Sequence, residues 1–377
     1  MVVPRPLIER PLRVIFYTDS TSIGGAEISL ANLIATVSQT IESVVVGVDD
    51  RVLDRFTATR PQVEQILLTD RGPGAFLNHW NTFRRLSPDV VHLNLCTPWA
   101  GAIGLAAALT LPNARVVRVD QLPLRTTDAV ELWRTRCLSL RVDAHVAVGE
   151  ASARRMEDFY ALGRNTVRSI PNGVPDRGEP PPLPDRLAGE MVLGCIGRLD
   201  PMKAQDVLLR AVAQVEGVQL VILGEGGERP ALEQLAQELG IADRLSLPGW
   251  VENPHTYLAN FDVLALPSRS EGFPLTIGEA MLAGRSVVAT RVGSIPEAVV
   301  DGETGLLVEK NDVEGLALAL RRLRDDPALR ERFGKRGREI AVAQLTVERM
   351  TDRYETLWQE LVASPQHPRW RIPRPKD

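Results

Sequence analysis

The sequence predicts an α/β protein made of two doubly wound, parallel-sheet domains in tandem. Short runs of β-branched residues alternate with longer helix-like stretches along the chain, the pattern of a parallel sheet covered by helices on both faces. The length of 377 residues exceeds what one ordinary core uses and suits two domains. The alternation stops once, at residues 175–190, where five prolines and few apolar side chains indicate an extended linker.

The first domain is expected to comprise residues 1–174. Its sheet is predicted from seven short apolar or β-branched runs, each separated from the next by helix-like or turn-like sequence. These runs are Leu12–Tyr17, Ser43–Val48, Gln65–Thr69, Asp89–Asn94, Arg115–Val119, Ala144–Val148 and Val167–Ile170.

The second domain is expected at residues 191–346, where the alternation restarts. Six further runs predict its strands. They are Met191–Gly197, Val218–Leu223, Leu245–Leu247, Asp262–Leu266, Ser286–Ala289 and Gly305–Val308.

Residues 347–362 predict a final amphipathic helix, and residues 364–377, rich in proline and charge, predict a poorly ordered tail. The apolar residues of this helix share one stripe at helical spacing. They are Met350, Tyr354, Leu357, Trp358 and Leu361.

Composition excludes several classes of function. The formal net charge of −4 gives no global attraction to nucleic acid. The three cysteines lack metal-ligand spacing and are expected to be reduced. The charged, proline-containing N-terminus differs from a signal peptide, and the longest apolar run, Ala100 to Leu111, is too short to span a membrane. We therefore expect a cytoplasmic protein whose contact with a membrane, if it has one, is peripheral.

Two cations follow the first strand of the second domain. Asp200 suits the N-cap of the next helix and Pro201 its first position, which would put Lys203 in the first turn and Arg198 at the end of the strand. Two cations beside a helix N-terminus repel its dipole, and a bound diphosphate would relieve that conflict. The alternative is that both side chains point into solvent.

Two carboxylates lie in the segment that follows the strand Asp262–Leu266. Pro274 marks the start of a helix, so Glu271 precedes that helix and Glu279 lies within it. The free amides of Leu275 and Thr276 at its N-terminus would accept an anion. Carboxylates beside such a pocket can accept hydrogen bonds from sugar hydroxyls. The alternative is a glutamate that favours the helix dipole and another on the surface.

Adjacent glycines, Gly24 and Gly25, follow the strand Leu12–Tyr17 and precede a helix expected over Ile28–Val37. Glycines at this place let backbone approach a ligand closely, although a flexible turn would also explain them.

These segments together resemble family 4 glycosyltransferases, which are retaining enzymes with the GT-B fold. The resemblance covers nearly the whole chain, and the order and spacing of the motifs carry it. The motifs are the paired glutamates within Ser270-Glu-Gly-Phe-Pro-Leu-Thr-Ile-Gly-Glu-Ala280, Gly197-Arg-Leu-Asp-Pro-Met-Lys203, Gly249-Trp-Val251, Gly293-Ser-Ile-Pro-Glu-Ala-Val299, Asp301-Gly-Glu-Thr-Gly-Leu-Leu-Val308, Ile170-Pro-Asn-Gly-Val174 and Gly24-Gly-Ala-Glu27.

The resemblance implies two domains facing a central cleft, a last helix that crosses back to the first domain, and a donor that is a nucleotide diphosphate sugar, most often of UDP or GDP. Arg198 and Lys203 would stabilise the diphosphate leaving group, with Glu271 on the transferred sugar and Glu279 on the ribose. The remaining donor-binding positions it implies are Gly24, Gly25, Trp250, Val251, Phe273, Leu275 and Thr276. No Asp-x-Asp pair occurs, so neither a metal nor another cofactor is expected.

The acceptor side is less defined. Many relatives have a histidine at the end of the strand Arg115–Val119, whereas Asp120 occupies that place here and is expected on the acceptor side. The acceptor is a glycan, a lipid or a small molecule. Five arginines of the first domain form either a surface for an acidic acceptor or solvated helix faces, and they are Arg84, Arg85, Arg125, Arg134 and Arg136. A nucleotide-sugar 2-epimerase and a non-catalytic sugar-nucleotide-binding protein remain as alternative functions.

Overall fold

The computed structural model describes residues 10–69, 72, 74–178, 180 and 191–365. Nearly all of the N-terminal segment, most of the predicted linker and nearly all of the predicted tail therefore lie outside the described residues. By its internal contacts the chain divides into two compact units. Unit 1 comprises Met1–Gly173 and Val347–Asp377, and unit 2 comprises Val174–Thr346.

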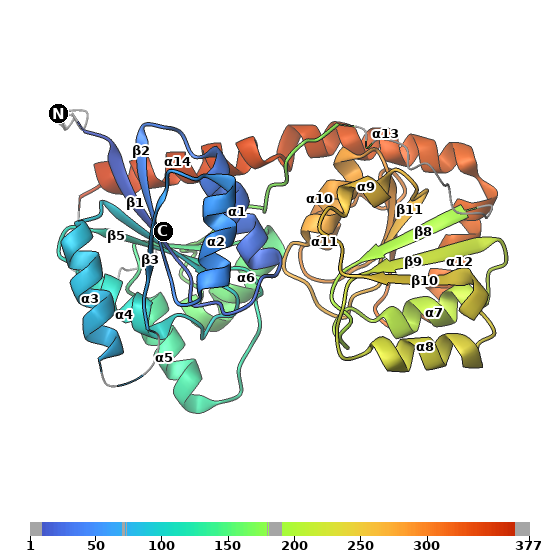
Figure 1. Cartoon of the computed structure of the whole chain (residues 1–377), viewed down its shortest axis with the longest axis horizontal. Coiled ribbons are helices and arrows are strands. Elements are labelled where there is room, and N and C mark those ends of the chain that lie inside the picture. The colour runs from blue at the N-terminus through green and yellow to red at the C-terminus, as the bar shows by residue number, and fades with distance from the viewer. Residues whose placement is uncertain (1–9, 70–71, 73, 179, 181–190, 366–377) are drawn as a thin grey trace. The chain divides into compact units, whose positions relative to one another are not determined.

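Unit 1 contains a seven-stranded parallel sheet in the order β3-β2-β1-β4-β5-β6-β7 (Figure 1). Each of the seven predicted runs overlaps one strand. The strands are β1 (Leu12–Tyr17), β2 (Ile41–Gly47), β3 (Glu64–Leu67), β4 (Val90–Leu95), β5 (Arg115–Asp120), β6 (Ala144–Ala147) and β7 (Val167–Ser169).

Helices cover both faces of this sheet because successive strand residues point to opposite sides. In β1, Val14 and Phe16 pack with α1, α2 and α14, whereas Ile15 and Tyr17 pack with α3 and α4. The helices of unit 1 are α1 (Gly25–Thr36), α2 (Asp50–Thr59), α3 (Ala75–Leu86), α4 (Ala102–Leu109), α5 (Ala129–Ser139), α6 (Glu150–Met156), the π-helix η1 (Glu157–Ala161) and α14 (Val347–Ala363).

The last helix, α14, belongs to unit 1, as the family resemblance implies. Trp358 on its apolar stripe is fully buried, and its ring meets those of Phe16 and His92 edge-on, with centroids 5.6 Å apart in each case. Thr351 shares a 2.6 Å hydrogen bond with Thr36 of α1. The helix is therefore an integral part of the core that α1 and the sheet build.

Unit 2 contains a six-stranded parallel sheet in the order β10-β9-β8-β11-β12-β13. Figure 1 shows α7, α8 and α12 on one face and α9 and α10 on the other. The strands are β8 (Met191–Ile196), β9 (Val218–Leu223), β10 (Leu245–Gly249), β11 (Val263–Leu266), β12 (Ser286–Thr290) and β13 (Gly305–Val308). The helices are α7 (Gln205–Ala213), α8 (Arg229–Glu238), the 3-10 turn η2 (Ala242–Arg244), α9 (His255–Leu258), α10 (Leu275–Leu282), α11 (Ile295–Ala298), α12 (Val313–Asp325) and α13 (Pro327–Gln344).

Each sheet has one point at which the strand order reverses. In unit 1, β1 lies between β2 and β4, and in unit 2, β8 lies between β9 and β11. Ligands of doubly wound sheets bind outside the carboxyl ends of the strands at such a point. The loops that follow β1, β8 and β11 are therefore the first places to look for a site.

Candidate functional site

The loop after β8 folds differently from the helix start that the sequence predicts. The Asp200 carboxylate accepts hydrogen bonds from the backbone amides of Met202 (2.9 Å) and Lys203 (3.2 Å). Ala204 has a left-handed backbone conformation, with φ 54°. Helix α7 consequently begins only at Gln205. The prediction that Asp200 caps α7 and that Lys203 lies in its first turn is wrong, because the Asp200 side chain holds a separate turn instead.

Lys203 forms an ion pair with the predicted sugar-binding carboxylate. Its Nζ lies 2.6 Å from Glu271 Oε1, and the Ser268 hydroxyl donates to the same oxygen at 2.7 Å. The Glu271 side chain is only 8% exposed. An ammonium has three donor hydrogens, so Lys203 retains capacity to bind an anion beside Glu271. The pair joins the loops after β8 and β11 at the reversal point of the sheet.

Arg198 lies in solvent, apart from this pair. Its side chain is 75% exposed, and its guanidinium is 3.2 Å from Asp200 Oδ2. Surface ion pairs of this kind contribute little to stability, so the guanidinium can leave Asp200 at small cost. The structure thus brings Lys203 and Glu271 together and leaves Arg198 at the end of the strand without contact to either glutamate.

The N-terminus of α10 lies directly after Glu271 in the chain. Pro274 is the N-cap residue and Leu275 begins the helix, as predicted. Phe273 is buried, and the Thr276 hydroxyl oxygen is buried with no hydrogen-bond partner among the described residues. Unpaired buried hydroxyls are rare in folded proteins. The helix therefore presents both its first amides and an unused hydroxyl at this place.

Glu279 lies on the same helix, one turn after Leu275. Burial raises the pKa of its carboxyl, and the nearby charge of Arg177 opposes that rise. The side chain nevertheless keeps part of its surface exposed. A carboxylate in such surroundings gains from a ligand hydroxyl that donates a hydrogen bond to it.

Backbone contacts hold these loops close together. A Cβ at Gly293, which has φ 55°, would lie 2.1 Å from the Glu271 carbonyl oxygen, and the Ser294 amide donates to the Gly272 carbonyl at 3.0 Å. A Cβ at Gly226 would lie 2.2 Å from the Leu199 carbonyl oxygen. The glycines permit contacts between loops that any side chain would block.

Trp250 and Val251 follow β10 beside these loops. The Gly224 amide donates to the Gly249 carbonyl at 2.8 Å, which ties the ends of β9 and β10 together. Trp250 is 72% exposed, whereas Val251 is partly buried. An exposed indole on a tied loop offers a flat apolar surface at the rim of the candidate site.

Arg269 was missed by sequence reasoning, although it holds the two main loops together. Its guanidinium donates to the Pro201 carbonyl (2.5 Å) and to Asp206 (2.8 Å), and its amide donates to the Met202 carbonyl (2.7 Å). No motif signals this role, because the partners lie more than 60 residues away in the sequence.

In unit 1, the adjacent glycines form the start of α1, three residues before the predicted start. The Gly24 amide donates to the Glu27 carboxylate at 2.8 Å, which caps the helix one turn early. A Cβ built on Gly25 meets no atom within 4 Å. The fold itself therefore does not require a glycine at position 25.

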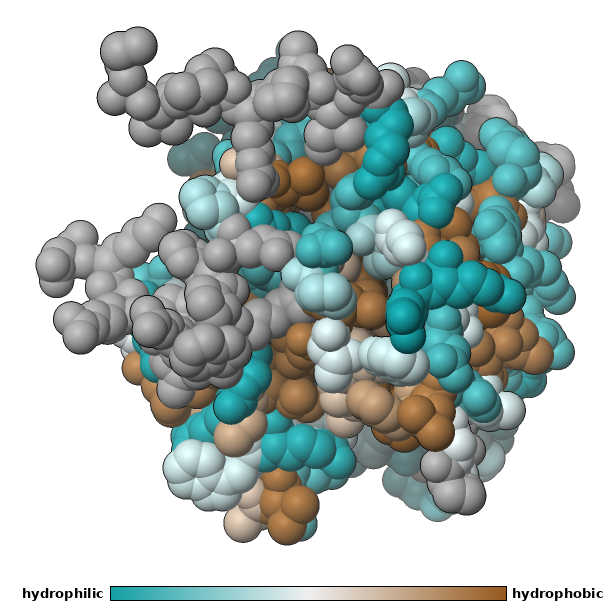
Figure 2. Space-filling model, turned by 90° about the vertical axis from the view of Figure 1, so that its left-hand side faces the viewer, coloured by the Kyte–Doolittle hydropathy of each residue, from teal (hydrophilic) through white to brown (hydrophobic). Residues whose placement is uncertain are grey.

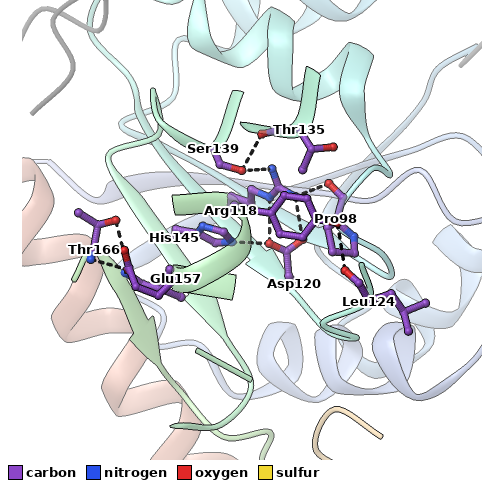
Figure 3. Close-up of polar contacts among 11 residues, drawn as sticks. Pro98, Arg118, Asp120, Leu124, Thr135, Ser139, His145, Glu157 and Thr166 are labelled. Atoms are coloured by element: carbon purple, nitrogen blue, oxygen red, sulfur yellow. Dashed lines mark hydrogen bonds and ion pairs between the residues drawn. The ribbon is translucent and has the colours of Figure 1, made fainter. Parts of the chain in front are cut away.

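Asp120, predicted on the acceptor side, is fully buried at the end of β5 (Figure 3). Both of its oxygens accept hydrogen bonds from Arg118 at 3.0 Å, and the His145 ring bonds to Oδ2. Burial alone would raise the pKa of Asp120, but the charge of Arg118 and the His145 hydrogen bond lower it. Arg118 also bonds to the Ser139 hydroxyl (2.7 Å). These contacts fix the strand end and α5, while a role for Asp120 toward the acceptor stays a prediction.

Two family models match this chain in succession. The model described as Glycosyltransferase Family 4 matches residues 23–177, and the model described as Glycosyl transferases group 1 matches residues 185–340. Between them they cover most of the chain. The chain belongs to the group 1 and family 4 glycosyltransferases.

The chain spans about half, or less, of the length of the curated relatives that it matches. The lipopolysaccharide core biosynthesis glycosyltransferase LpsE of Rhizobium meliloti is 37% identical over 170 residues, which are 45% of this chain and 50% of LpsE. A D-inositol 3-phosphate glycosyltransferase of Mycobacterium ulcerans is 42% identical over 158 residues, 39% of this chain and 32% of that protein.

Solved structures confirm the GT-B fold expected for a family 4 glycosyltransferase. HepE of Anabaena, solved in complex with UDP, superposes with a TM-score of 0.82 at 21% identity, covering 93% of this chain and 100% of that one. Sucrose-phosphate synthase of Thermosynechococcus elongatus gives a TM-score of 0.79 at 21% identity, covering 93% and 99%.

The described residues include no helix with the length and apolarity of a membrane span. In the same part of the chain, no three His, Cys, Asp or Glu side chains are grouped as a metal site would need.

Proposed function

We propose that this chain is a retaining, metal-independent glycosyltransferase that moves a hexose-type sugar from a nucleotide diphosphate sugar to an acceptor in polysaccharide, glycolipid or other glycoconjugate biosynthesis. The observation that carries the proposal is the pair of Lys203 and Glu271 at the reversal point of the unit 2 sheet, next to the N-terminus of α10. A cation for a diphosphate thus lies 2.6 Å from an acceptor for sugar hydroxyls.

The diphosphate binds to cations and helix amides in this proposal. Lys203, the amides of Leu275 and Thr276 and the unused Thr276 hydroxyl receive its oxygens, and Arg198 turns from Asp200 to join them. Charge that develops on the departing phosphate is then stabilised by groups already in place, which commonly lowers a barrier more than any other single effect. The cations neutralise the charge that a metal ion would otherwise neutralise.

The other donor residues recognise the sugar and the nucleoside. Glu271 accepts hydrogen bonds from hydroxyls of the transferred sugar and Glu279 from the ribose, while Trp250 and Val251 contact the base. We also retain Gly24 and Gly25 in the donor-binding set, because the open space over Gly25 leaves room for a ligand. HepE structures with UDP and with UDP-glucose support a uridine donor as the first to test.

Unit 1 carries a surface that suits peripheral contact with a membrane. Apolar side chains are exposed in the N-terminal halves of α3 and α5, which both follow the carboxyl edge of the sheet. Trp133 is 61% exposed and Val130 is 74% exposed on α5. Figure 2 shows apolar and polar side chains next to one another on this end of unit 1. We use the name α3–α5 surface for these exposed residues: Phe76 and Leu77 lie on α3, and Val130 and Trp133, with the neighbouring Arg125, Arg134 and Arg136, lie on or just before α5.

Two arginines of the α3–α5 surface lie against aromatic rings. Arg136 lies 5.5 Å from the Trp133 ring centroid, and Arg125 lies 5.0 Å from that of Phe159. Exposed tryptophan beside arginine is the combination that binds an anionic bilayer surface. One relative, LpsE, is named for lipopolysaccharide core biosynthesis, and this supports a lipid-linked acceptor. We therefore propose that the acceptor is reached at an anionic membrane surface.

Incubation with labelled UDP-, GDP- and ADP-sugars and candidate acceptors tests the function. Transfer or donor hydrolysis with retained anomeric configuration is expected, whereas a changed sugar would indicate a 2-epimerase and binding alone a non-catalytic protein.

Lys203→Met should lower the rate by about 10²-fold or more. Lys310→Met is the matched control, since Lys310 is an exposed lysine of the same unit. Equal rates for both variants would remove Lys203 from the mechanism.

A further inference from the structure

A chain of hydrogen-bonded polar side chains runs beneath the first turn of α1. The Asn94 side-chain amide donates to the Ala26 carbonyl (3.0 Å), and the Gln121 amide donates to Asn94 Oδ1 (2.7 Å). The Asn172 amide donates to Gln121 Oε1 (2.9 Å), and the Ser29 hydroxyl donates to Asn172 Oδ1 (2.7 Å). All four side chains are buried. We call Asn94, Gln121, Asn172 and Ser29 the amide chain.

The amide chain starts and ends on α1 and passes through the ends of three strands on the way. Asn94 lies in β4, Gln121 directly follows β5, and Asn172 lies three residues after β7. Buried amides are costly to leave unpaired, so each bond in the chain constrains the next. The first turn of α1 is thereby held in one position relative to the carboxyl edge of the sheet.

The same part of α1 is bound by the residue after Asn172. The Asn32 side-chain amide donates to the Gly173 carbonyl (3.3 Å), and the Gly173 amide donates to the Met350 sulfur at 3.1 Å. Gly173 is the last residue of unit 1 before the chain enters unit 2, and Met350 is the fourth residue after the chain returns. The segment that leaves unit 1 is thus attached directly to α1.

The location of the amide chain points to a task beyond packing. Apolar side chains could fill the same volume at no cost in buried polar groups. The helix turn that the chain holds begins with Gly24 and Gly25, and Gly25 has open space over it. A loop that must meet a ligand with its backbone needs its position fixed from below, because small misplacements of reacting groups are expensive in rate.

We propose that Asn172, together with Gln121 and Ser29, is a positioning residue that holds the turn of Gly24 and Gly25 for sugar transfer. The proposal rests on the proposed function, in which that turn contacts the donor. The amide chain itself does not touch the substrate. It acts through the position of the first turn of α1.

Hydrogen exchange tests the structural half of the proposal without any substrate. Ser29→Ala and Gln121→Met each break the amide chain while keeping side chains of tolerable size. Both should speed amide exchange in residues 28–30, the first hydrogen-bonded amides of α1, by about 10-fold or more, because local opening governs exchange. Thr36→Val is the control, since it removes another polar contact between α1 and α14 at the far end of the helix. It should leave exchange at residues 28–30 unchanged.

Kinetics test the functional half. Both variants should lower kcat by about 10-fold or more, a loss on the scale known for misplaced groups, with little change in the Kd for UDP measured on the full chain. Because both variants break one chain, their effects on kcat should not add in the double variant. Unchanged exchange in either variant, or faster exchange with wild-type kcat, would overturn the proposal. If the wild type transfers no sugar at all, the proposed function fails, and the exchange result still decides whether the chain positions the turn.

Discussion

At the scale of single residues, the two cations predicted for the diphosphate differ in their surroundings. Lys203 is partly buried against Glu271, whereas the Arg198 side chain is largely in solvent and pairs with Asp200. Loss of Lys203 leaves a buried carboxylate without its cation, so its variants affect folding and chemistry together. Loss of Arg198 removes a surface pair and separates the two effects.

Arg198→Ala therefore gives the cleaner test of the role in leaving-group stabilisation. The melting temperature should fall by no more than about 4 °C, since exposed ion pairs contribute about 0–1 kcal/mol. The transfer rate should fall by about 10²-fold. Thermal denaturation and a transfer assay on the same preparation measure both. A normal rate would show that Arg198 stays with Asp200 during the reaction.

Glu279→Gln should stabilise the protein at neutral pH while weakening nucleotide binding. Burial raises the folded-state pKa of Glu279, so above that pKa folding must bury a charge, and glutamine removes this cost. We expect a rise in melting temperature on the order of 2 °C at pH 7. The gain should shrink as the pH falls through the raised pKa and vanish below 4.5, where the carboxyl is neutral in both states.

Nucleotide affinity should fall by about 10-fold in Glu279→Gln, the scale of a lost hydrogen bond to a charged group. Calorimetric titration with UDP measures the change, and Glu252→Gln, at an exposed position of unit 2, is the control. A lower melting temperature at pH 7 would mean that Glu279 has a stabilising partner in the fold.

At the scale of elements, the start of α1 has a glycine that the fold does not require and that a bound ligand would explain. Glu27 caps the helix by accepting a hydrogen bond from the Gly24 amide, and Gly25 is the first residue of the helix. A methyl group added at Gly25 would have no atom within 4 Å. Alanine is the better helix former by about 1 kcal/mol within a helix, and part of that gain applies at its first position. A glycine kept here against that preference suggests a ligand.

Gly25→Ala should accordingly keep or slightly raise the melting temperature and lower the transfer rate by at least about 10-fold, on the scale of rate losses from small misplacements. Gly227→Ala, at a second glycine with open space around its Cβ, should change neither. Differential scanning fluorimetry and the transfer assay decide between the outcomes. Full activity of Gly25→Ala would leave the glycine pair with a role in the turn alone.

At the scale of the whole molecule, a chain with net charge −4 carries an exposed tryptophan, Trp133, against the guanidinium of Arg136 on unit 1. Wild-type protein should sediment with vesicles that contain anionic phospholipid and not with neutral ones, and salt should weaken the binding. Trp133→Ser combined with Val130→Ser should abolish sedimentation. Leu318→Ser is the matched control, because Leu318 is a 65% exposed apolar residue of α12 in the other unit. Equal losses in both variants would refute the assignment of the α3–α5 surface.

Pattern alone located all thirteen strands of the described residues, and every strand end lies within two residues of the prediction. Strands of a doubly wound sheet are continuous apolar runs, so their signal is local. Pro274 and the apolar stripe of α14 were equally local signals. The start of α7 could not be located from local sequence. An Asp200 side chain can either hold a turn or cap a helix, and only the packed loop shows that it holds a turn.

The sequence by itself determined the two-sheet fold, the family resemblance and the candidate carboxylates and cations, since residue type and spacing along the chain suffice for these. The tertiary structure decided which groups touch. It paired Lys203 with Glu271, placed Arg198 in solvent, buried Asp120 between Arg118 and His145, and linked Ser29 to Asn172. Contacts between residues 68 or 143 positions apart leave no periodic trace in a sequence, because they arise only when the strand ends are brought to one edge of a sheet.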